Sequence, residues 1–303
     1  MATIQGVNWP VDISGESGKG NYRNAPLVLN GLSESDSAVQ AAAAAEAIVG
    51  KLYSDTGGNT VRVPINEATV SSGYWSTYVG AISGMLAQGN VIVCYWAHSS
   101  GKPAWMHHYW SMWGKVVDQF GGNGQAFFEP INEPYGYHNA SDLVKKVYDP
   151  WLSRHRGVPR DRVLLDGVGY AKNVAAVGAL VSGTLLSVHD YTWFSHSPLS
   201  ESGWASHLAG QIGGYASRTV LTEYGAPMTT GLNYDAADTS GGDANTISYL
   251  RGITDEARRL GIGSVYWPGI GIADTYRLYT ISGNSLTLTN QSGLDRLKYG
   301  WGQ

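Results

Sequence analysis

Short runs of β-branched and aromatic residues recur along the whole chain and alternate with segments of helix-forming composition. Most of these runs are almost continuously apolar, which is typical of parallel strands that are covered on both faces. Eight runs are found, at residues 3–9, 59–65, 90–96, 125–132, 162–168, 185–191, 218–225 and 263–269. The alternation predicts an α/β protein built around a parallel sheet.

Helices are predicted between these strands, at roughly 34–52, 73–88, 103–119, 140–154, 171–182, 203–216 and 244–260. Eight strand–helix units in 303 residues predict a closed (β/α)8 barrel, or TIM barrel, as a single domain over residues 1–303. An open doubly wound sheet is the alternative that the pattern leaves.

Two predicted loops are longer than the usual connection of about two to six residues. Residues 10–32 follow strand one, and residues 269–293 follow strand eight. The second loop contains two strand-like stretches joined by Ser282-Gly283-Asn284, which predicts a β-hairpin. Because active sites of such barrels lie at the C-terminal ends of the strands, both loops would form walls of a cleft.

Composition limits the class of ligand. Charged residues make up only 15% and the net charge is -4, so nothing in the chain attracts nucleic acid or an anionic membrane. The 19 tyrosines and 11 tryptophans far outnumber the 4 phenylalanines. Rings with a polar edge suit a sugar-binding surface as well as a large core. The single cysteine, Cys94, lies in an apolar run and is expected to be a buried thiol.

Polar side chains stand near the ends of the predicted strands, where a barrel would bring them together. They are Asn8, Arg62, His98, Asn132, Glu133, His189, Tyr191, Glu223 and Trp267. Two of them, Glu133 and Glu223, are acids at the ends of strands four and seven. Two opposed carboxyl groups suit cleavage of a glycosidic bond, with one as general acid and the other as nucleophile or base.

All but the first of these residues lie in motifs that are similar to those of a known family. The motifs are TVRVP with Arg62, YWAHSS with His98, PINEP with Asn132 and Glu133, VHDY with His189 and Tyr191, LTEYG with Glu223, and VYWPG with Trp267. The order of these motifs, and the strand on which each lies, resemble those of glycoside hydrolase family 5, a family of retaining (β/α)8 glycosidases. The resemblance extends over about residues 4–270.

The resemblance implies that Glu133 is the catalytic acid and base, and that Glu223 is the nucleophile that attacks the sugar. Glu133 must then hold a proton near neutral pH, which burial and a second carboxylate favour. Arg62 and Tyr191 would keep Glu223 anionic. We therefore expect the two carboxyl groups to face each other across about 5 Å.

The resemblance also implies a sugar-binding surface around the two glutamates. Asn132 would hold the 2-hydroxyl group, His98 and His189 would orient the sugar and the acid, and Trp267 would stack under the ring. Further tryptophans expected along the cleft are Trp9, Trp96 and Trp193, together with Trp75 and Trp105.

Some residues near these motifs have a structural interpretation. Glu129, four residues before Glu133 and on the same face of the strand, is expected to support the site by hydrogen bonding rather than to react. Trp105, Tyr109 and Trp113 recur every four residues, which is typical of the buried stripe of a helix.

The predicted activity is hydrolysis of a β-linked polysaccharide or oligosaccharide. A β-1,4-glucan is the default substrate, and a β-mannanase or an exo-acting β-glycosidase is the alternative within the family. A carbohydrate-binding barrel without catalysis is the alternative from another class. We expect no cofactor and no metal, because the motifs HExxH and GxSxG and complete nucleotide-binding loops are absent from the sequence.

The sequence also leads to expectations about the oligomeric state, the partners and the localisation of the protein. We expect a monomer that binds neither nucleic acid nor membrane, since no apolar run of about 18 residues exists. Secretion is also expected, and the patterns Asn139-Ala-Ser141 and Asn290-Gln-Ser292 are compatible with it as acceptors for N-glycosylation.

Overall fold

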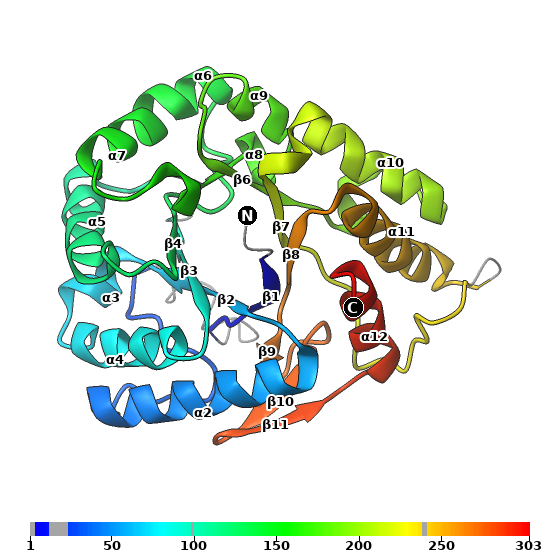
Figure 1. Cartoon of the computed structure of the whole chain (residues 1–303), viewed down its shortest axis with the longest axis horizontal. Helices are drawn as coiled ribbons and strands as arrows, with labels where there is room; N and C mark the ends of the chain where they lie inside the picture. Colours follow the sequence, from blue (N-terminus) through cyan, green and yellow to red (C-terminus); the bar gives the residue numbers. More distant parts are fainter. Residues whose placement is uncertain (1–3, 12–23, 98–99, 238–240) are drawn as a thin grey trace.

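The computed structural model describes residues 4–11, 24–97, 100–237 and 241–303. Figure 1 looks along a ring of eight strands that is surrounded by helices. The strands are β1 Gln5–Asn8, β2 Thr60–Ile65, β3 Asn90–Tyr95, β4 Ala126–Glu129, β5 Leu164–Asp166, β6 Leu185–His189, β7 Thr219–Glu223 and β8 Gly263–Tyr266.

The strands pair in parallel in the order β4-β3-β2-β1-β8-β7-β6-β5. A parallel bridge between Phe128 of β4 and Val163, the residue before β5, joins the two edges of this sheet. The sheet is therefore closed, and the predicted (β/α)8 barrel is confirmed. All eight predicted strands are present, although most are shorter than predicted.

The helical elements cover the outside of the barrel (Figure 1). They are α2 Ala38–Thr56, α3 Glu67–Ser71, α4 Trp75–Leu86, α5 Met106–Phe120, α6 Ala140–Leu143, the π-helical η1 Val144–Tyr148, α7 Asp149–Arg154, α8 Val168–Ala171, α9 Val174–Gly178, α10 Glu201–Ile212, α11 Ala244–Leu260 and α12 Gln291–Gly300, with the short 3-10 segments η2 Arg160–Arg162, η3 Thr192–Phe194 and η4 Gly213–Arg218. None of the helices within the described residues is both long and apolar enough to span a bilayer.

Local signals set several helix ends. Ser37 caps α2 in a capping box with Gln40, and Gly261 ends α11 in the left-handed conformation, with φ 64°. Asn139 and Asn290, the two asparagines of the acceptor patterns, are N-caps, and their side chains accept the backbone N–H groups of Asp142 and Gly293. Both asparagine side chains therefore have a structural role in the chain as folded.

The structure departs from the prediction in three places. The helix predicted over 171–182 is broken near its start, because Ala171 and Asn173 have φ of 54° and 51° where α8 ends and α9 begins. α3 and α12 were not predicted. The predicted hairpin is confirmed: β10 Tyr279–Ser282 and β11 Ser285–Leu288 pair around Gly283-Asn284, and β9 Ile270–Gly271 pairs with β10.

The barrel interior has an apolar layer near the N-terminal ends of the strands. It consists of Ile4, Ile92, Phe127, Leu164, Leu185, Val220 and Val265. Residues two positions further along a strand point to the same side. In β3 to β6 these residues are Cys94, Glu129, Asp166 and Ser187, so a buried polar layer lies above the apolar one, toward the C-terminal rim.

The close contact between α2 and α4 gives a test of the packing. A methyl group on Gly84 of α4 would come 2.2 Å from the backbone oxygen of Ala42. We expect Gly84→Ala to lower the free energy of unfolding by about 1–3 kcal/mol, because the helices must move apart.

Gly114 of α5 provides the matched control, since no described atom lies within 4 Å of a methyl group placed there. Gly114→Ala should raise the free energy of unfolding by about 0.5–1 kcal/mol through the greater helix propensity of alanine. Urea unfolding followed by circular dichroism measures both variants. Equal effects of the two substitutions would contradict the packing argument.

Candidate active site

The polar layer is organised around Arg62 of β2, which is 2% exposed. Its Nε and Nη2 donate to the two carboxylate oxygens of Glu129, at 2.8 and 2.7 Å. Its Nη1 donates to Asn8 Oδ1 at 2.8 Å and to Glu223 Oε1 at 2.6 Å. Its Nη2 also donates to Asn132 Oδ1 at 2.6 Å. One guanidinium group thus joins residues of β1, β4 and β7 and the segment after β4.

The positive charge of Arg62 is balanced by the carboxylates that it contacts in this layer. Burial alone would lower the pKa of Arg62, but its acidic neighbours raise that pKa above the usual value. Burial alone would raise the pKa of Glu129, but the charge and hydrogen bonds of Arg62 lower it to about 2. Burial raises the pKa of Cys94, so the expected buried thiol stays neutral and accepts from Arg62 Nη2 at 3.1 Å. The layer therefore contains a stable buried ion pair.

Glu223 is the last residue of β7, and its side chain is 8% exposed. Its Oε1 accepts from Arg62, while its Oε2 accepts from the Tyr191 hydroxyl at 3.0 Å. Burial, followed by the charge of Glu223, raises the pKa of Tyr191, so the phenol keeps its proton and donates it. A bulge at the end of β6 brings His189 opposite Glu223. Both oxygens of Glu223 therefore have donors that fix their direction.

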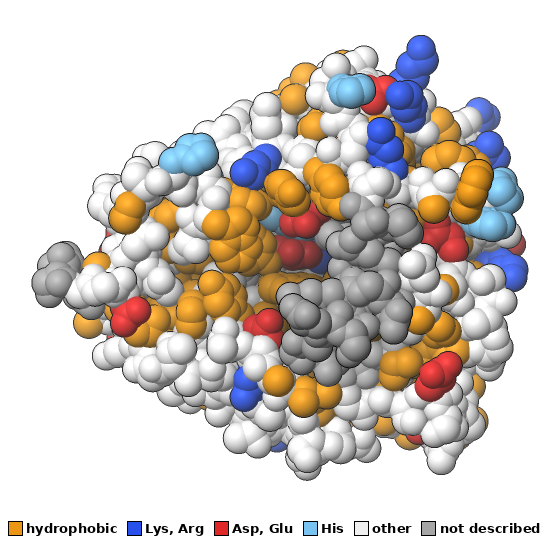
Figure 2. All heavy atoms as spheres, turned by 180° about the vertical axis from the view of Figure 1, so that it is seen from behind, with side chains coloured by type: hydrophobic (Ala, Val, Ile, Leu, Met, Phe, Trp, Pro, Cys, Tyr) orange, Lys and Arg blue, Asp and Glu red, His pale blue; other side chains and the backbone are white. Residues whose placement is uncertain are grey.

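Glu133 lies four residues beyond the end of β4 and has φ 45°, in the left-handed region. Its Oε1 is 3.0 Å from His189 Nδ1, and its side chain is 25% exposed. One carboxylate oxygen of Glu133, one of Glu223 and one ring nitrogen of His189 all lie within 4.8 Å of one another. On the face shown in Figure 2, acidic side chains lie at the bottom of a hollow bordered by hydrophobic ones.

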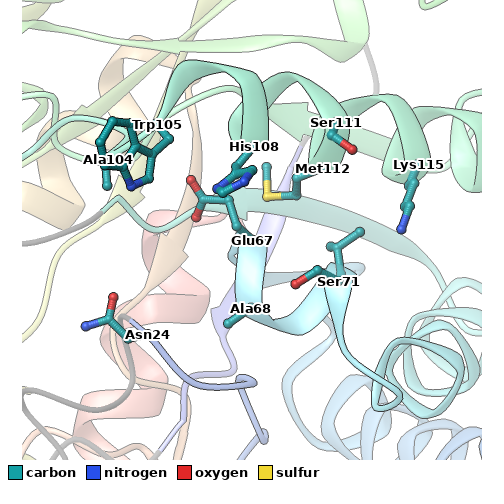
Figure 3. A pocket seen from close by; sticks show the side chains of 11 residues that line it. Asn24, Glu67, Ala68, Ser71, Ala104, Trp105, His108, Ser111, Met112 and Lys115 are labelled. Atoms are coloured by element: carbon teal, nitrogen blue, oxygen red, sulfur yellow. The ribbon is translucent and has the colours of Figure 1, made fainter.

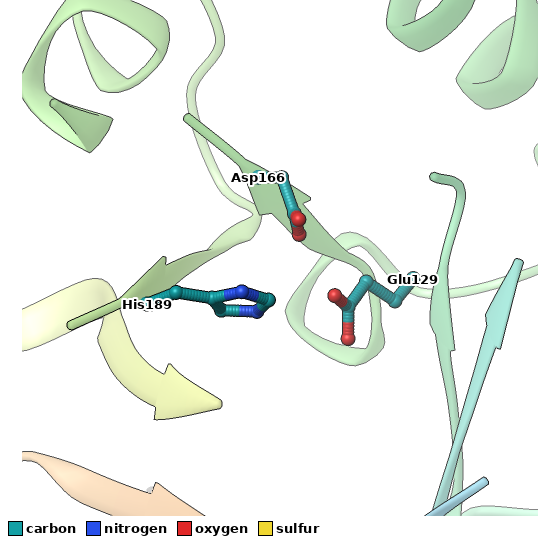
Figure 4. A group of neighbouring side chains, drawn as sticks. All are labelled: Glu129, Asp166 and His189. Atoms are coloured by element: carbon teal, nitrogen blue, oxygen red, sulfur yellow. The ribbon is translucent and has the colours of Figure 1, made fainter. Parts of the chain in front are cut away.

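Asp166, the last residue of β5, also reaches this group and was not predicted as a site residue. Its Oδ2 accepts the backbone N–H of Glu133 at 2.9 Å. Figure 4 shows the carboxyl group of Asp166 together with the carboxyl group of Glu129 and the ring of His189. Burial, and then the charge of Glu129, raises the pKa of Asp166 well above its usual value, which favours the protonated form of Asp166 beside Glu129. The only signal in the sequence was an acid inside the apolar run RVLLDGV.

The predicted aromatic residues have different positions. Trp96 and Trp267 are half-buried, with ring centroids 5.7 Å apart. Trp193 is 61% exposed and stacks on Tyr191 at 4.2 Å between centroids. Trp9 requires a correction, because it is fully buried and donates to the backbone oxygen of Asn30. It belongs to the core, since a ring enclosed by protein has no face for a sugar.

His98 lies outside the described residues. Trp75 packs against Phe120 with ring centroids 6.3 Å apart, in the core between helices. Tyr109 and Trp113 are buried, as their spacing predicts. The helical stripe does not extend to Trp105, because this residue precedes the first turn of α5 and is 65% exposed.

Trp105 lines a cavity of about 430 Å³ between α3 and α5 (Figure 3). Glu67, His108 and Lys115 contribute charged or polar groups to the same cavity. The Glu67 carboxylate accepts from the hydroxyl of Tyr95, the last residue of β3, at 2.7 Å. The Tyr95 carbonyl accepts the Asn132 N–H at 2.8 Å. The cavity and the Glu133 region are therefore on the same rim of the barrel.

Among the residues that the structure describes, two groups of three side chains have donor atoms close enough for a metal ion. They are Glu129, Asp166 and His189, and Glu133, His189 and Glu223. Arg62 occupies both oxygens of Glu129 and one of Glu223. A fixed positive charge at hydrogen-bond distance opposes the binding of a divalent cation. The absence of a metal from the reaction stays a prediction.

The buried ion pair leads to a pH-dependent prediction. We expect Glu129→Gln to lower the free energy of unfolding by about 3–5 kcal/mol at pH 7, because the Arg62 charge would lose a buried partner. The folded-state pKa of Glu129, about 2, lies below the ordinary value of 4.5. Its contribution to stability is therefore complete above pH 4.5 and is lost as the pH falls toward 2.

Urea unfolding of the wild type and the variant between pH 7 and about pH 2.5 measures this difference. Asp55→Asn is the control, because Asp55 pairs with Lys51 on the surface of α2, and its loss should cost less than about 0.5 kcal/mol. A difference between wild type and Glu129→Gln that stays constant below pH 4.5 would show that the pKa of Glu129 is not lowered.

No family model matches the chain, and no curated protein matches its sequence. Solved structures, in contrast, match nearly its whole length. Subunit Z of the clostridial cellulose synthase from Clostridioides difficile has a TM-score of 0.67 at 13% identity, with 97% of this chain and 99% of that chain covered. A family 5 xyloglucanase from Paenibacillus pabuli has a TM-score of 0.65 at 16% identity, with 99% and 98% covered.

A broad-specificity endoglucanase of glycoside hydrolase family 5 from Clostridium acetobutylicum has a TM-score of 0.62 at 15% identity, with 99% of this chain and 97% of that chain covered. At these identities the likeness concerns the arrangement of the backbone. In its fold, the chain is thus a (β/α)8 barrel of the kind found in glycoside hydrolase family 5.

Proposed function

We propose that this protein is a glycoside hydrolase that cleaves a β-linked polysaccharide with retention of configuration. The observation that carries the proposal is that one carboxylate oxygen of Glu133 lies within 4.8 Å of one carboxylate oxygen of Glu223 at the C-terminal rim of the barrel. Retaining enzymes hold their two carboxyl groups about 5–5.5 Å apart, whereas inverting enzymes need about 6.5–9.5 Å to fit a water molecule. The short separation favours a covalent intermediate.

Glu223 is the proposed nucleophile. Arg62 and Tyr191 donate to its two oxygens, which stabilises a negative charge and fixes the direction of attack. In the first step, a Glu223 oxygen bonds to the anomeric carbon as the bond to the leaving-group oxygen breaks. The leaving oxygen takes its proton from Glu133.

Glu133 is the proposed acid and base, and it is the more exposed of the two carboxyl groups. After it has protonated the leaving group, it is an anion that can remove a proton from water. That water attacks the anomeric carbon and releases Glu223, while Glu133 regains its proton. His189 contacts Glu133 through Nδ1 and holds the carboxyl group beside the scissile bond.

The surrounding side chains suit a sugar. The Asn132 amide oxygen is bound to Arg62, so its amide nitrogen is the end that can donate to a sugar 2-hydroxyl. Trp96, Trp193 and Trp267 present rings at the same rim. We propose β-1,4-glucan as the first substrate to test and β-mannan as the second. Structures of similar fold include an endoglucanase and a β-mannanase with mannohexaose.

Two variants separate the proposed roles. Glu133→Ala and Glu223→Ala should each lower turnover of an unactivated cello-oligosaccharide by about two to four orders of magnitude. With a 2,4-dinitrophenyl β-glycoside, whose leaving group needs no protonation, Glu133→Ala should still form the glycosyl-enzyme and release a burst of dinitrophenol, whereas Glu223→Ala should not. Stopped-flow absorbance and intact-protein mass spectrometry measure these steps.

Glu201→Ala is the control for this experiment, because Glu201 lies on α10 and pairs only with Arg251 among the described ion pairs. It should leave turnover unchanged. Full activity of Glu223→Ala, or inverted products in proton NMR of the first turnover, would exclude the proposed mechanism. Monomeric state and secretion stay predictions.

The cavity beside Trp105 leads to a further prediction about the length of the substrate. An exposed indole next to a fixed carboxylate suits a sugar ring, so a long chain would reach it and a short substrate would not. We expect Trp105→Ala to raise KM for the polysaccharide about three- to tenfold and to leave KM for an aryl monoglycoside unchanged. Tyr299→Ala, at another exposed aromatic residue, is the control. Equal KM values of wild type and Trp105→Ala on polysaccharide would exclude the cavity as a binding site.

A further inference from the structure

We propose that Asp166 is a positioning residue, which holds the backbone of Glu133 in the one conformation that directs the acid toward the bond to be cleaved. The inference rests on the proposed function. It concerns a residue that is buried below the cleft and that the proposed reaction does not use directly.

The backbone of Glu133 needs support. A φ of 45° is uncommon for a residue with a side chain, and such a conformation costs on the order of 1–3 kcal/mol unless its surroundings enforce it. The N–H of Glu133 donates to Asp166 Oδ2 at 2.9 Å, and its carbonyl accepts the N–H of Tyr135 at 2.7 Å. Asp166 therefore supplies the side-chain contact that fixes this peptide group.

Asp166 is well placed to act as a rigid support. It ends β5 and is fully buried, and its own backbone oxygen accepts from the Tyr148 hydroxyl at 2.7 Å. Its Oδ1 has no hydrogen-bond partner among the described residues. The carboxyl group lies with Glu129 and His189 in one cluster, in which a donor atom of each is within 4.8 Å of the other two (Figure 4).

The protonation state agrees with this arrangement. Burial and the neighbouring Glu129 raise the pKa of Asp166, so the group is a neutral acid. Oδ2 accepts from Glu133, which leaves Oδ1 as the oxygen that can carry the proton. An asparagine has the same shape, the same acceptor and a donor in place of the hydroxyl, and is therefore the conservative substitute.

The contact from Asp166 is made with Glu133 and not with Glu223. Glu133 is held through its backbone by Asp166, whereas the oxygens of Glu223 accept from Arg62 and Tyr191. His189 Nδ1 lies between the two carboxyl groups, at 3.0 Å from Glu133 and 3.5 Å from Glu223. Loss of the Asp166 contact should therefore impair the step that needs acid assistance and spare the attack by the nucleophile. General loss of structure would impair both.

The experiment compares Asp166→Ala, Asp166→Asn and wild type on two substrates. For an unactivated cello-oligosaccharide, we expect kcat/KM of Asp166→Ala to fall by about 10- to 100-fold, since small displacements of a catalytic group have effects of this size. For a 2,4-dinitrophenyl β-glycoside, kcat/KM should change by less than about threefold, because its cleavage needs no acid. Asp166→Asn should stay within about threefold of wild type on both substrates.

Asp190→Asn is the matched control, because Asp190 is also a buried carboxyl group, adjacent to His189 in sequence, but bonds His207 instead of Glu133. It should retain wild-type kcat/KM on both substrates. Equal losses of Asp166→Ala on both substrates, or a loss in Asp166→Asn as large as in Asp166→Ala, would overturn the proposal. If Asp166→Ala does not fold, Asp166→Leu replaces it, since leucine has the same branched arrangement of heavy atoms without an acceptor and leaves no cavity.

A second readout does not depend on activity. A crystal structure of Asp166→Ala or Asp166→Leu should show Glu133 outside the left-handed region, and that of Asp166→Asn should keep φ near 45°. An unchanged φ in the variants without an acceptor would refute the support by Asp166. If wild type cleaves no glycoside, the proposed function fails, and the φ of Glu133 still decides whether Asp166 holds this backbone.

Discussion

A single buried guanidinium group determines the geometry of this site. Arg62 cannot lose its proton under ordinary conditions, and a buried charge is tolerated only when each of its donors has an acceptor. The residues around it must therefore supply oxygens at fixed places, as Asn8, Glu129, Asn132 and Glu223 do. Because these residues come from different strands, the position of the proposed nucleophile depends on closure of the whole barrel.

The site is also asymmetric in a way that suits its two proposed roles. The Glu223 carboxyl group is nearly buried and contacts a permanent cation, whereas that of Glu133 is more exposed and contacts a histidine. The first environment favours a stable anion, and the second allows a proton to be given and regained. Glu129 takes up the remaining charge of Arg62, so that Glu223 need not neutralise it alone.

The alternation of apolar runs was sufficient to predict the eight strands and the barrel, because parallel strands covered on both faces have this pattern. The broken helix after β5 was missed, since left-handed residues such as Asn173 leave no mark in hydrophobic periodicity. Trp9 was misplaced because sequence does not tell which aromatic residues the loops will cover. Asp166 was missed because its partners, Glu129 and Glu133, become neighbours only through the pairing of β4 with β5.

Each of several strands contributes one residue to the apolar layer and one to the polar layer inside the barrel. In β5 these residues are Leu164 and Asp166, and in β4 they are Phe127 and Glu129, two positions apart in each strand. Loops at the rim can thus be exchanged while the apolar layer below them stays intact. In protein engineering, this makes the lower half of the barrel a constant base on which new specificities can be installed.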